Sequence, residues 1–486
     1  MYLVINLGLK SLRCIIFDKA GKTVYSISEI VDTTIKNNFV EQNPASYKKI
    51  LNNLLKKLSK LDVCYKINYI SVTTSANCLL GVSKDLKPVT KVSTVLDFRA
   101  NDTTFKKILL KKKCFIDPSH NISKIIWYKH QNKKLFNKTK YWINNSDYIS
   151  YLITGELISD PLNLSKFYIG NLKNTFKILN KFKIKDINFP KEKAIGYQLP
   201  ISKSLITKYK FNKKCKFILT TYDAICACIG SVNKKNLYNN ACEVSGTVTS
   251  FRYLSKKKPL KKKKLKVSHI PLIDHYIIGL SNNLGGGIIE WYKAFFRSRN
   301  YYASLEKSYN KGNNYFYFFP FIFGDRDMGF RETSRGIFFG LGSNTNIHDM
   351  TKSVVDASCF VSRNLFDRLN SIKKNFTSIT LSGGLARLKF INILKSNLFG
   401  LKVFTCKNFE STALGCLVLM LVSSKKIKFK NAVEIINLEE VKKNNIYKST
   451  IRKKYNFFKT FIINNKKIFN IKDETLIKKN HHIRNL

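Results

Sequence analysis

At 486 residues the chain is too long for one ordinary hydrophobic core, and its 44% hydrophobic content excludes a globally disordered protein. The formal net charge of +55 indicates attraction to polyanions, but the lysines are spread through the chain together with many asparagines and isoleucines. Because no recognisable nucleic-acid-binding module accompanies this charge, we expect no specific nucleic-acid partner.

The eleven cysteines form no Cys-x-x-Cys pair and no Cys/His spacing suited to zinc. Most lie in apolar runs, which is typical of buried thiols in a reducing compartment. The chain runs from Met1 straight into a strand pattern, and no apolar stretch is long enough to span a bilayer. These features predict a soluble cytoplasmic protein that does not act at a membrane.

The N-terminal segment has the pattern of a β-meander. Residues 2–6 and 12–18 read as strands, and a turn over 19–22 leads to a third strand over 23–27. Residues 8–11 are therefore expected to form the loop between the first two strands.

A helix is predicted after this meander. Asn43 and Pro44 form an N-cap and a proline at the first helical position, and apolar residues follow at helical spacing up to Leu58. Residues 70–74 are apolar enough for a buried strand, and residues 123–179 are expected to be mostly helical.

A second repeat of the pattern begins in the middle of the chain. Residues 217–221 read as a strand that leads to Asp223, and residues 224–229 resemble a closely packed helix. Another strand begins near Ala241. We therefore predict domains over 1–229 and 230–440, with a Lys/Asn-rich appendage or tail over 441–486.

Three glycine-bearing segments follow apolar runs, namely 5–8, 244–247 and 381–384. Glycine in a tight turn lets backbone N–H groups approach a phosphate without a Cβ in the way. Each segment alone is also compatible with an ordinary turn. Three in order, with Asp223 between the first two, indicate a nucleotide held between two domains.

Several ordered blocks over about residues 2–425 resemble the FGGY family of carbohydrate kinases. The blocks are Ile5-Asn6-Leu7-Gly8 with Ser11-Leu12-Arg13 and Gly21-Lys22, Val40-Glu41-Gln42-Asn43-Pro44, Asp97-Phe98-Arg99, Lys124-Ile125-Ile126-Trp127, Asp147-Tyr148 with Leu152-Ile153-Thr154-Gly155, Asp160 with Asn163 and Ser165, Gly324-Asp325-Arg326, Arg335-Gly336-Ile337-Phe338-Phe339-Gly340-Leu341, Ser382-Gly383-Gly384-Leu385-Ala386, and Glu410-Ser411-Thr412-Ala413-Leu414-Gly415.

The resemblance implies an α/β fold with two actin-like, ribonuclease H-like domains around a cleft for nucleotide and sugar. It also implies that the chain transfers the γ-phosphoryl group of MgATP to a hydroxyl of a ketose, pentulose or polyol. Domain 1–229 would bind the sugar and domain 230–440 the nucleotide. The assembly state is left open, with a homodimer as one alternative.

The family's functional positions map onto residues of this chain. Asp223 matches the catalytic base, although an aspartate there is also suited to capping the following helix. Gly8, Lys10, Gly246, Thr247, Gly383 and Gly384 match positions near the phosphates. Asn77, Cys78 and Asp97 lie where members contact the sugar, together with Asp223. For Asn77 a turn role is equally open, and for Cys78 packing is the alternative.

Two of the departures from the family pattern concern the metal and the phosphate loop. Asn6 stands where the family has an aspartate that helps to hold magnesium, and Leu9 stands where it has a threonine. Hard cations favour carboxylates, so Asn6 would bind the metal weakly, through water. Lys10 could supply part of the missing charge. The alternative is a pseudokinase that binds sugar or nucleotide without efficient transfer, and a basic nucleic-acid-binding protein on this fold is a more distant one.

Overall fold

The computed structural model describes residues 1–114, 116–259, 265–294, 301–324, 334–407, 410–444 and 448–470. The described chain forms two compact units. The first unit comprises Met1–Gly230, Ile270–Asp274 and Thr412–Ile435, and the second comprises Ser231–His269, His275–Ser411 and Ile436–Leu486. The longest segment of the first unit thus ends one residue after the expected domain end at 229, but this unit also takes in two later segments of the chain.

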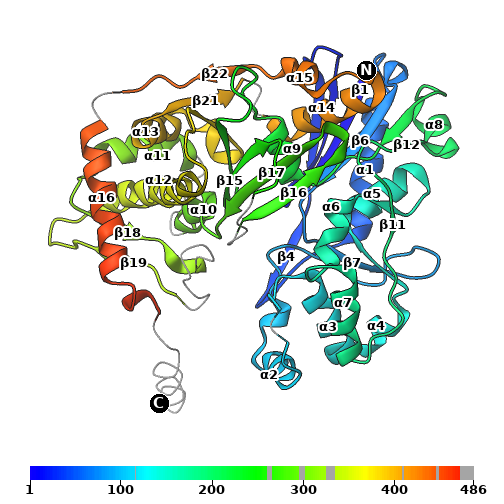
Figure 1. Cartoon of the computed structure of the whole chain (residues 1–486), viewed down its shortest axis with the longest axis horizontal. Coiled ribbons are helices and arrows are strands. Elements are labelled where there is room, and N and C mark those ends of the chain that lie inside the picture. The colour runs from blue at the N-terminus through cyan, green and yellow to red at the C-terminus, as the bar shows by residue number, and fades with distance from the viewer. Residues whose placement is uncertain are drawn as a thin grey trace. The chain divides into compact units, whose positions relative to one another are not determined.

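A six-stranded sheet forms the centre of the first unit, in the order β12-β13-β6-β1-β2-β3 (Figure 1). Strands β1, β2 and β3 form an antiparallel meander, whereas β1, β6 and β13 run parallel. The strands are β1 (Tyr2–Leu7), β2 (Ser11–Phe17), β3 (Thr23–Ile30), β6 (Tyr69–Thr74), β12 (Gln198–Pro200) and β13 (Lys216–Ile218). The predicted meander is confirmed, while β13 ends three residues before the predicted end at 221.

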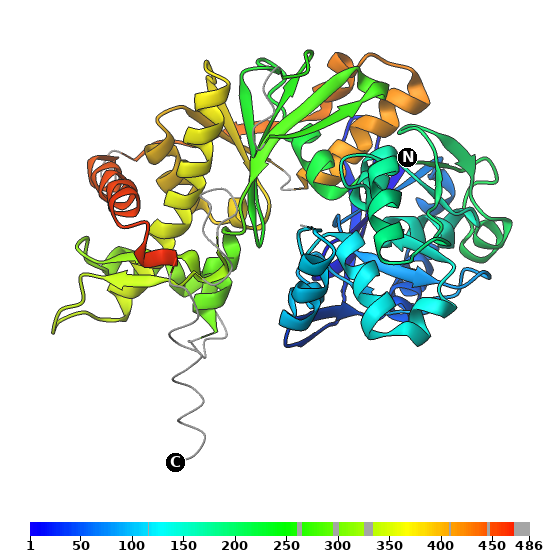
Figure 2. The same cartoon turned by 60° about the horizontal axis from the view of Figure 1, so that its bottom comes forward.

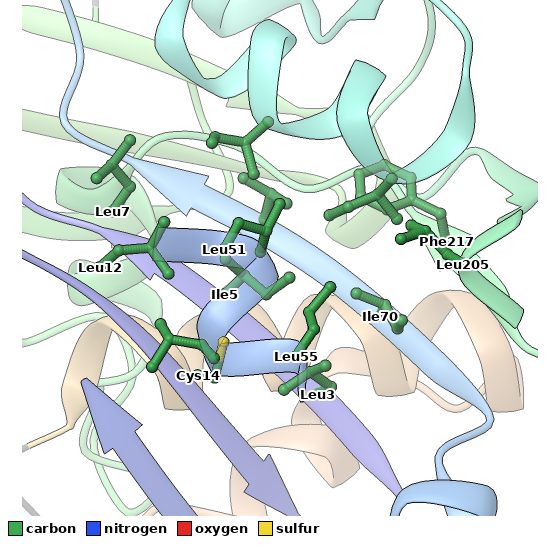
Figure 3. Packing of buried hydrophobic residues seen from close by; sticks show 14 of the residues in the cluster. Leu3, Ile5, Leu7, Leu12, Cys14, Leu51, Leu55, Ile70, Leu205 and Phe217 are labelled. Atoms are coloured by element: carbon green, nitrogen blue, oxygen red, sulfur yellow. The ribbon is translucent and has the colours of Figure 1, made fainter. Parts of the chain in front are cut away.

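The core of this sheet is built by alternation. Leu3, Ile5 and Leu7 of β1 point to the face that packs against helix α1 (Pro44–Leu58), where Leu51 and Leu55 meet them (Figure 3). The predicted helix start is confirmed, because the Asn43 side chain accepts a hydrogen bond from the Ala45 N–H at 3.0 Å.

A second, five-stranded sheet and several short helices complete the first unit. The sheet order is β4-β5-β8-β7-β9, with β4 (Thr33–Lys36), β5 (Phe39–Gln42), β7 (Leu79–Val82), β8 (Val92–Ser93) and β9 (Tyr141–Asn144). The segment expected to be mostly helical contains α3 (Asn121–Gln131), α4 (Lys133–Lys138), α5 (Asn145–Thr154), α6 (Pro161–Leu164) and α7 (Leu172–Lys181), interrupted by β9 and by β10 (Ile158–Ser159). The other helices are α2 (Thr103–Lys111) and α8 (Lys203–Tyr209).

Helix α14 (Ser411–Lys425) belongs almost entirely to the first unit, although it comes late in the sequence. It packs against α9 (Asp223–Ile229) so closely that a Cβ on Gly415 would lie 1.8 Å from the Cys226 carbonyl oxygen. The prediction of one continuous domain over 230–440 could not anticipate this, because helix packing in space leaves no mark on chain order. The short helix α15 (Phe429–Ala432) follows in the same unit.

The second unit repeats the strand pattern of the first. Its seven-stranded sheet has the order β16-β17-β15-β14-β20-β21-β22, in which β17, β15 and β14 are antiparallel and β14, β20 and β21 are parallel. The strands are β14 (Asn240–Ser245), β15 (Thr249–Ser255), β16 (Lys266–Ile270), β17 (His275–Ser281), β20 (Ser378–Ser382), β21 (Lys402–Cys406) and β22 (Leu438–Glu440). Three antiparallel strands that continue into parallel strands thus occur in each unit, although in the second unit β16 comes between β15 and β17 along the chain.

Helices α10 (Gly286–Lys293), α11 (Tyr301–Lys311), α12 (Ile347–Ile372) and α13 (Lys389–Phe399) and the hairpin of β18 (Tyr317–Phe319) with β19 (Ile337–Phe339) complete this unit. Part of the expected appendage joins them, because α16 (Lys448–Asn464) lies beside α12 in both views (Figures 1 and 2). Tyr455 and Phe458 of α16 are buried in the core of the unit, and Lys454 forms a buried ion pair with Asp356 of α12. Residues 471–486 of the predicted appendage lie outside the described residues.

Candidate active site

In the first unit, the carboxyl ends of three neighbouring parallel strands meet at one edge of the sheet. Leu7 of β1 is in register with Thr74 of β6, and β13 lies beside β6. The segments that follow these strands are 8–10, 75–77 and 219–223. Ligand sites of α/β sheets form at this edge, so the topology gathers three of the sequence-predicted segments there.

Asp223 is the first residue of α9, and its side chain is partly exposed. The Ser75 hydroxyl donates a hydrogen bond to its Oδ2 at 3.4 Å. Tyr222 is the N-cap residue, so the interpretation of Asp223 as the cap itself is wrong by one position. A carboxylate at the first turn of a helix is favoured by the helix dipole, and this one keeps an exposed surface for chemistry.

The segment before Asp223 is fixed by two buried hydroxyl groups. Thr73 of β6 donates to the Thr221 carbonyl oxygen at 2.8 Å, and the Thr221 hydroxyl donates to Asp160 at 2.9 Å. Burial raises the pKa of Asp160 to about 6, and the Thr221 hydrogen bond acts in the opposite direction. These contacts hold the backbone that carries Asp223.

Asn6 lies on the face of β1 opposite the apolar side chains of Leu3, Ile5 and Leu7, and is 2% exposed. It is in register with Thr73, whose hydroxyl reaches Thr221. Asn6 therefore projects to the face of the sheet that carries the 219–223 segment.

The loop between β1 and β2 is held by polar contacts to its backbone. The Gly8 N–H donates to the Ser11 carbonyl oxygen at 2.9 Å, and the Gln42 amide donates to the Leu9 carbonyl oxygen at 2.7 Å. A Cβ on Gly8 would meet the Ser11 carbonyl oxygen at an ordinary contact distance of 3.7 Å. Packing within the protein does not require a glycine here, and Lys10 beside it is exposed.

Asn77 has a left-handed backbone (φ +59°) and is partly exposed at this edge. Its carbonyl oxygen accepts a hydrogen bond from the fully buried Lys124 at 3.4 Å, and Lys124 also donates to the Thr94 carbonyl oxygen at 2.6 Å. Burial lowers the pKa of Lys124 to about 8. Lys124 thus braces the Asn77 turn, a role that its place in the Lys-x-x-Trp block did not reveal.

Two residues expected to contact the sugar have other surroundings. The Cys78 side chain is completely buried, and burial raises the pKa of its thiol to about 12. Asp97 is also completely buried, where it accepts hydrogen bonds from Arg99 at 2.8 Å and from the Val40 N–H at 2.9 Å. Both expectations are corrected: enclosed side chains support the fold around the site and present no atom to a substrate.

In the second unit, the turn between β14 and β15 packs against two other glycine-bearing segments. The N–H groups of Gly286 and Gly287 donate to the carbonyl oxygens of Gly246 and Thr247 at 2.8 and 3.0 Å. A Cβ on Gly286 would lie 2.7 Å from the Gly246 carbonyl oxygen. This contact was not expected from the sequence, although three consecutive glycines at the start of a helix could have indicated it.

The turn after β20 approaches the same place. Gly383 has φ +88°, and a Cβ on it would lie 2.5 Å from the Ser245 carbonyl oxygen. In contrast, no atom of the described residues outside the adjoining chain lies within 4 Å of a Cβ built on Gly246 or Gly384. Two of the predicted phosphate-binding glycines therefore face open space, while Gly383 is required by the packing of the two turns.

Beneath these turns lies a buried ion pair between Glu243 of β14 and Lys395 of α13, with side chains 0% and 2% exposed. The Ser245 hydroxyl donates to the same Glu243 oxygen that Lys395 contacts. The sequence analysis did not identify this pair, because its partners are far apart in the chain.

The described residues contain neither a clustered metal site nor a membrane-spanning helix. Within the ranges given above, no group of three or more His, Cys, Asp or Glu side chains is arranged to hold a metal ion. None of the described helices is long and apolar enough to cross a membrane. The Asp325-Arg326 part of one family block lies outside the described residues.

Known family models match this chain in two separate stretches. The model of the N-terminal domain of the FGGY family of carbohydrate kinases matches residues 1–196, and that of its C-terminal domain matches residues 242–424. The chain is 22% identical to a gluconokinase of Bacillus subtilis over 461 residues, 88% of each chain. It is 22% identical to a xylulose kinase of Staphylococcus epidermidis over 444 residues, 85% of this chain and 86% of that one.

Solved structures show the same fold. A ligand-bound xylulose kinase from Lactobacillus acidophilus superposes with a TM-score of 0.80 at 20% identity, covering 96% of this chain and 99% of that one. Plasmodium falciparum glycerol kinase with ADP superposes with a TM-score of 0.74 at 18% identity, covering 94% and 97%. The expectation of an actin-like α/β fold is confirmed.

The two α/β units and the turns at their strand ends define the chain as an actin-like carbohydrate kinase, a phosphotransferase that acts on an alcohol group with ATP as donor. It belongs to the FGGY family of carbohydrate kinases.

Proposed function

We propose that this chain transfers the γ-phosphoryl group of MgATP to a hydroxyl of a ketose, pentulose or polyol, with Asp223 as general base. The observation that carries the proposal is the placement of Asp223, a partly exposed carboxylate at the strand-end edge that also carries Asn77 and the 8–10 loop. The acceptor hydroxyl gives its proton to Asp223 as its oxygen bonds to the γ-phosphorus, and the bond to the β–γ bridging oxygen breaks to release ADP.

The nucleotide phosphates are assigned to the open glycine turns. Gly246 and Gly384 offer space in which backbone N–H groups can meet phosphate oxygens, and Thr247 adds a hydroxyl. Gly383 keeps the two turns together. Gly8 and Lys10 of the first unit would contact the transferred phosphate.

Magnesium would be held mainly by the phosphates of ATP, because the described residues offer no dedicated cluster of three ligands. Asn6 would contribute an amide oxygen through water. The ion, when bound, neutralises charge on the phosphoryl oxygens. This donor set fits a cation that arrives with its nucleotide.

The direct test is ADP release by the purified protein with MgATP and a panel containing D-xylulose, D-gluconate and glycerol. We expect turnover with one acceptor, and a kcat about 10³-fold lower in Asp223→Asn. Asp18→Asn is the matched control, because Asp18 accepts N–H groups of Ala20 and Lys22 in the turn after β2, at the opposite edge of the sheet. Equal activity of Asp223→Asn and wild type would refute the base assignment.

The buried Asn6 favours a second candidate, a protein that binds its ligands but transfers slowly. Asn6→Asp restores a carboxylate near the metal. In a weakened kinase it should lower the Mg²⁺ concentration required for half-maximal rate, whereas in a protein that has lost transfer it should leave the rate at background. Calorimetric ATP binding by both variants separates these outcomes from misfolding.

Lys166 favours a sugar acid as a second class of acceptor. Its ammonium donates a hydrogen bond to the Tyr222 hydroxyl at 3.3 Å and lies over the Tyr222 ring, and Tyr222 precedes Asp223 in the chain. Among the described residues no carboxylate is recorded as its ion-pair partner, so a substrate carboxylate could bind there. Lys166→Met should then raise KM for D-gluconate and leave KM for D-xylulose unchanged. An equal change for both would remove this candidate.

A further inference from the structure

The phosphate turn of the second unit rests on a buried polar group whose position suggests a task beyond stability. The Lys395 ammonium contacts Glu243 Oε1 and lies 3.4 Å from the Ser245 hydroxyl oxygen. Ser245 in turn donates to Glu243 and lies 3.1 Å from the Thr249 hydroxyl. Ser245 and Thr249 are the two residues that bound the 246–248 turn, so the buried group fixes both ends of it.

The main chain at Glu243 also contacts the residue before the second glycine turn. The Ser382 hydroxyl, one residue before Gly383, donates to the Glu243 carbonyl oxygen at 2.8 Å. Gly383 itself lies against the Ser245 backbone. Glu243, which belongs to β14, is therefore connected to β20 and to α13. The turns that follow β14 and β20 carry Gly246 and Gly384.

An ion pair with side chains 0% and 2% exposed is costly to bury, and an apolar pair of similar volume would often be as stable. Glu243 also retains an oxygen, Oε2, that accepts no hydrogen bond from the residues the structure describes. Because net stability does not require this ion pair, the conformation of the segments that it joins is the property to test.

We propose that Lys395, Glu243 and Ser245 form a positioning group that holds the two nucleotide-binding turns in the conformation required by ATP before it binds. The inference rests on the proposed function, because it assigns ATP to these turns. Fixed turns lose less conformational freedom when the nucleotide arrives, so the group contributes to ATP affinity and leaves sugar recognition unaffected.

The test is calorimetric binding of MgATP in the absence of sugar, together with thermal unfolding. The double variant Glu243→Gln/Lys395→Met removes both charges and keeps the volumes, and Ser245→Ala removes only the hydroxyl. The control is Asp356→Asn/Lys454→Met, which neutralises another buried ion pair of the second unit, between α12 and α16. The single variant Lys395→Arg keeps the positive charge and should retain part of the ATP affinity that the double variant loses.

We expect the Glu243/Lys395 double variant to raise the Kd for ATP about tenfold or more, the loss typical of a charge-assisted hydrogen bond. The control should lower Tm but change Kd by no more than about twofold. Unchanged ATP affinity in the double variant, or an equal loss in the control, would overturn the positioning role. Failure of the wild-type protein to bind ATP would instead overturn the proposed function on which it rests.

Discussion

Each unit supports one of its candidate binding turns with a buried lysine, and the two lysines are stabilised differently. Lys124 of the first unit donates to two main-chain carbonyl oxygens, those of Thr94 and Asn77. Lys395 of the second unit forms an ion pair with Glu243 and also contacts Ser245. The first lysine is hydrogen-bonded to carbonyl dipoles and feels the buried Asp97 carboxylate only through space, whereas the second is in direct contact with its carboxylate partner.

This difference predicts different responses to mutation and to pH. A cation among carbonyl dipoles can release its proton, and burial indeed lowers the pKa of Lys124 to about 8. Loss of one member of an ion pair leaves the other charge buried without compensation. The second unit should therefore be the more sensitive to single substitutions.

The largest expected effect is that of Lys395→Met. It leaves the Glu243 carboxylate buried and uncompensated, which should lower the free energy of unfolding by about 3–5 kcal/mol. Adding Glu243→Gln should recover most of this loss. Urea unfolding of the single and double variants measures both effects, and a double variant no more stable than the single would contradict the explanation.

A glycine turn in each unit is expected to tolerate an added Cβ to a different degree. Gly383→Ala places a Cβ 2.5 Å from the Ser245 carbonyl oxygen at a left-handed backbone, so we expect a loss of about 3 kcal/mol. Gly8→Ala in the first unit meets ordinary contact distances and should cost less than about 1 kcal/mol. Thermal unfolding of the two variants side by side checks this, and equal losses would disprove the distinction.

A smaller effect is expected for Lys124→Met. The variant leaves two carbonyl oxygens without their donor and breaks no ion pair among the described residues, although the buried Asp97 carboxylate attracts the Lys124 charge through space; unfolding should therefore become easier by about 2 kcal/mol at neutral pH. A loss as large as that of Lys395→Met would mean that Lys124 is also compensated by a charge. Sugar affinity should fall with it, because Lys124 braces Asn77.

The smallest expected effect is the pH dependence that Lys124 gives to the stability of the chain. Its pKa is lowered in the folded chain to about 8 from the ordinary 10.5, so between these values the unfolded chain holds a proton that the folded chain has released. The stability of the wild type relative to Lys124→Met should therefore rise with pH over this window, by at most one proton's slope. Urea unfolding at several pH values measures the difference, and a flat or falling difference would show that Lys124 stays charged.

Local sequence patterns were sufficient for the first strands, the start of α1 and the glycine turns. Strand alternation, the Asn43-Pro44 cap and glycines after apolar runs express preferences of a few neighbouring residues, which the chain order preserves. Ordered motifs over most of the chain also identified the family, and the position of Asp223 after a strand made it the candidate base.

The tertiary structure alone decided which of those residues can meet a ligand. Cys78 and Asp97 stand in the right motifs but are enclosed, and Gly383 serves packing where Gly246 and Gly384 face open space. Likewise, Glu243 and Lys395 come together from strands and helices far apart in the sequence, as α14 joins a unit that began 400 residues earlier. Burial and long-range pairing depend on how elements pack, and no local pattern records that.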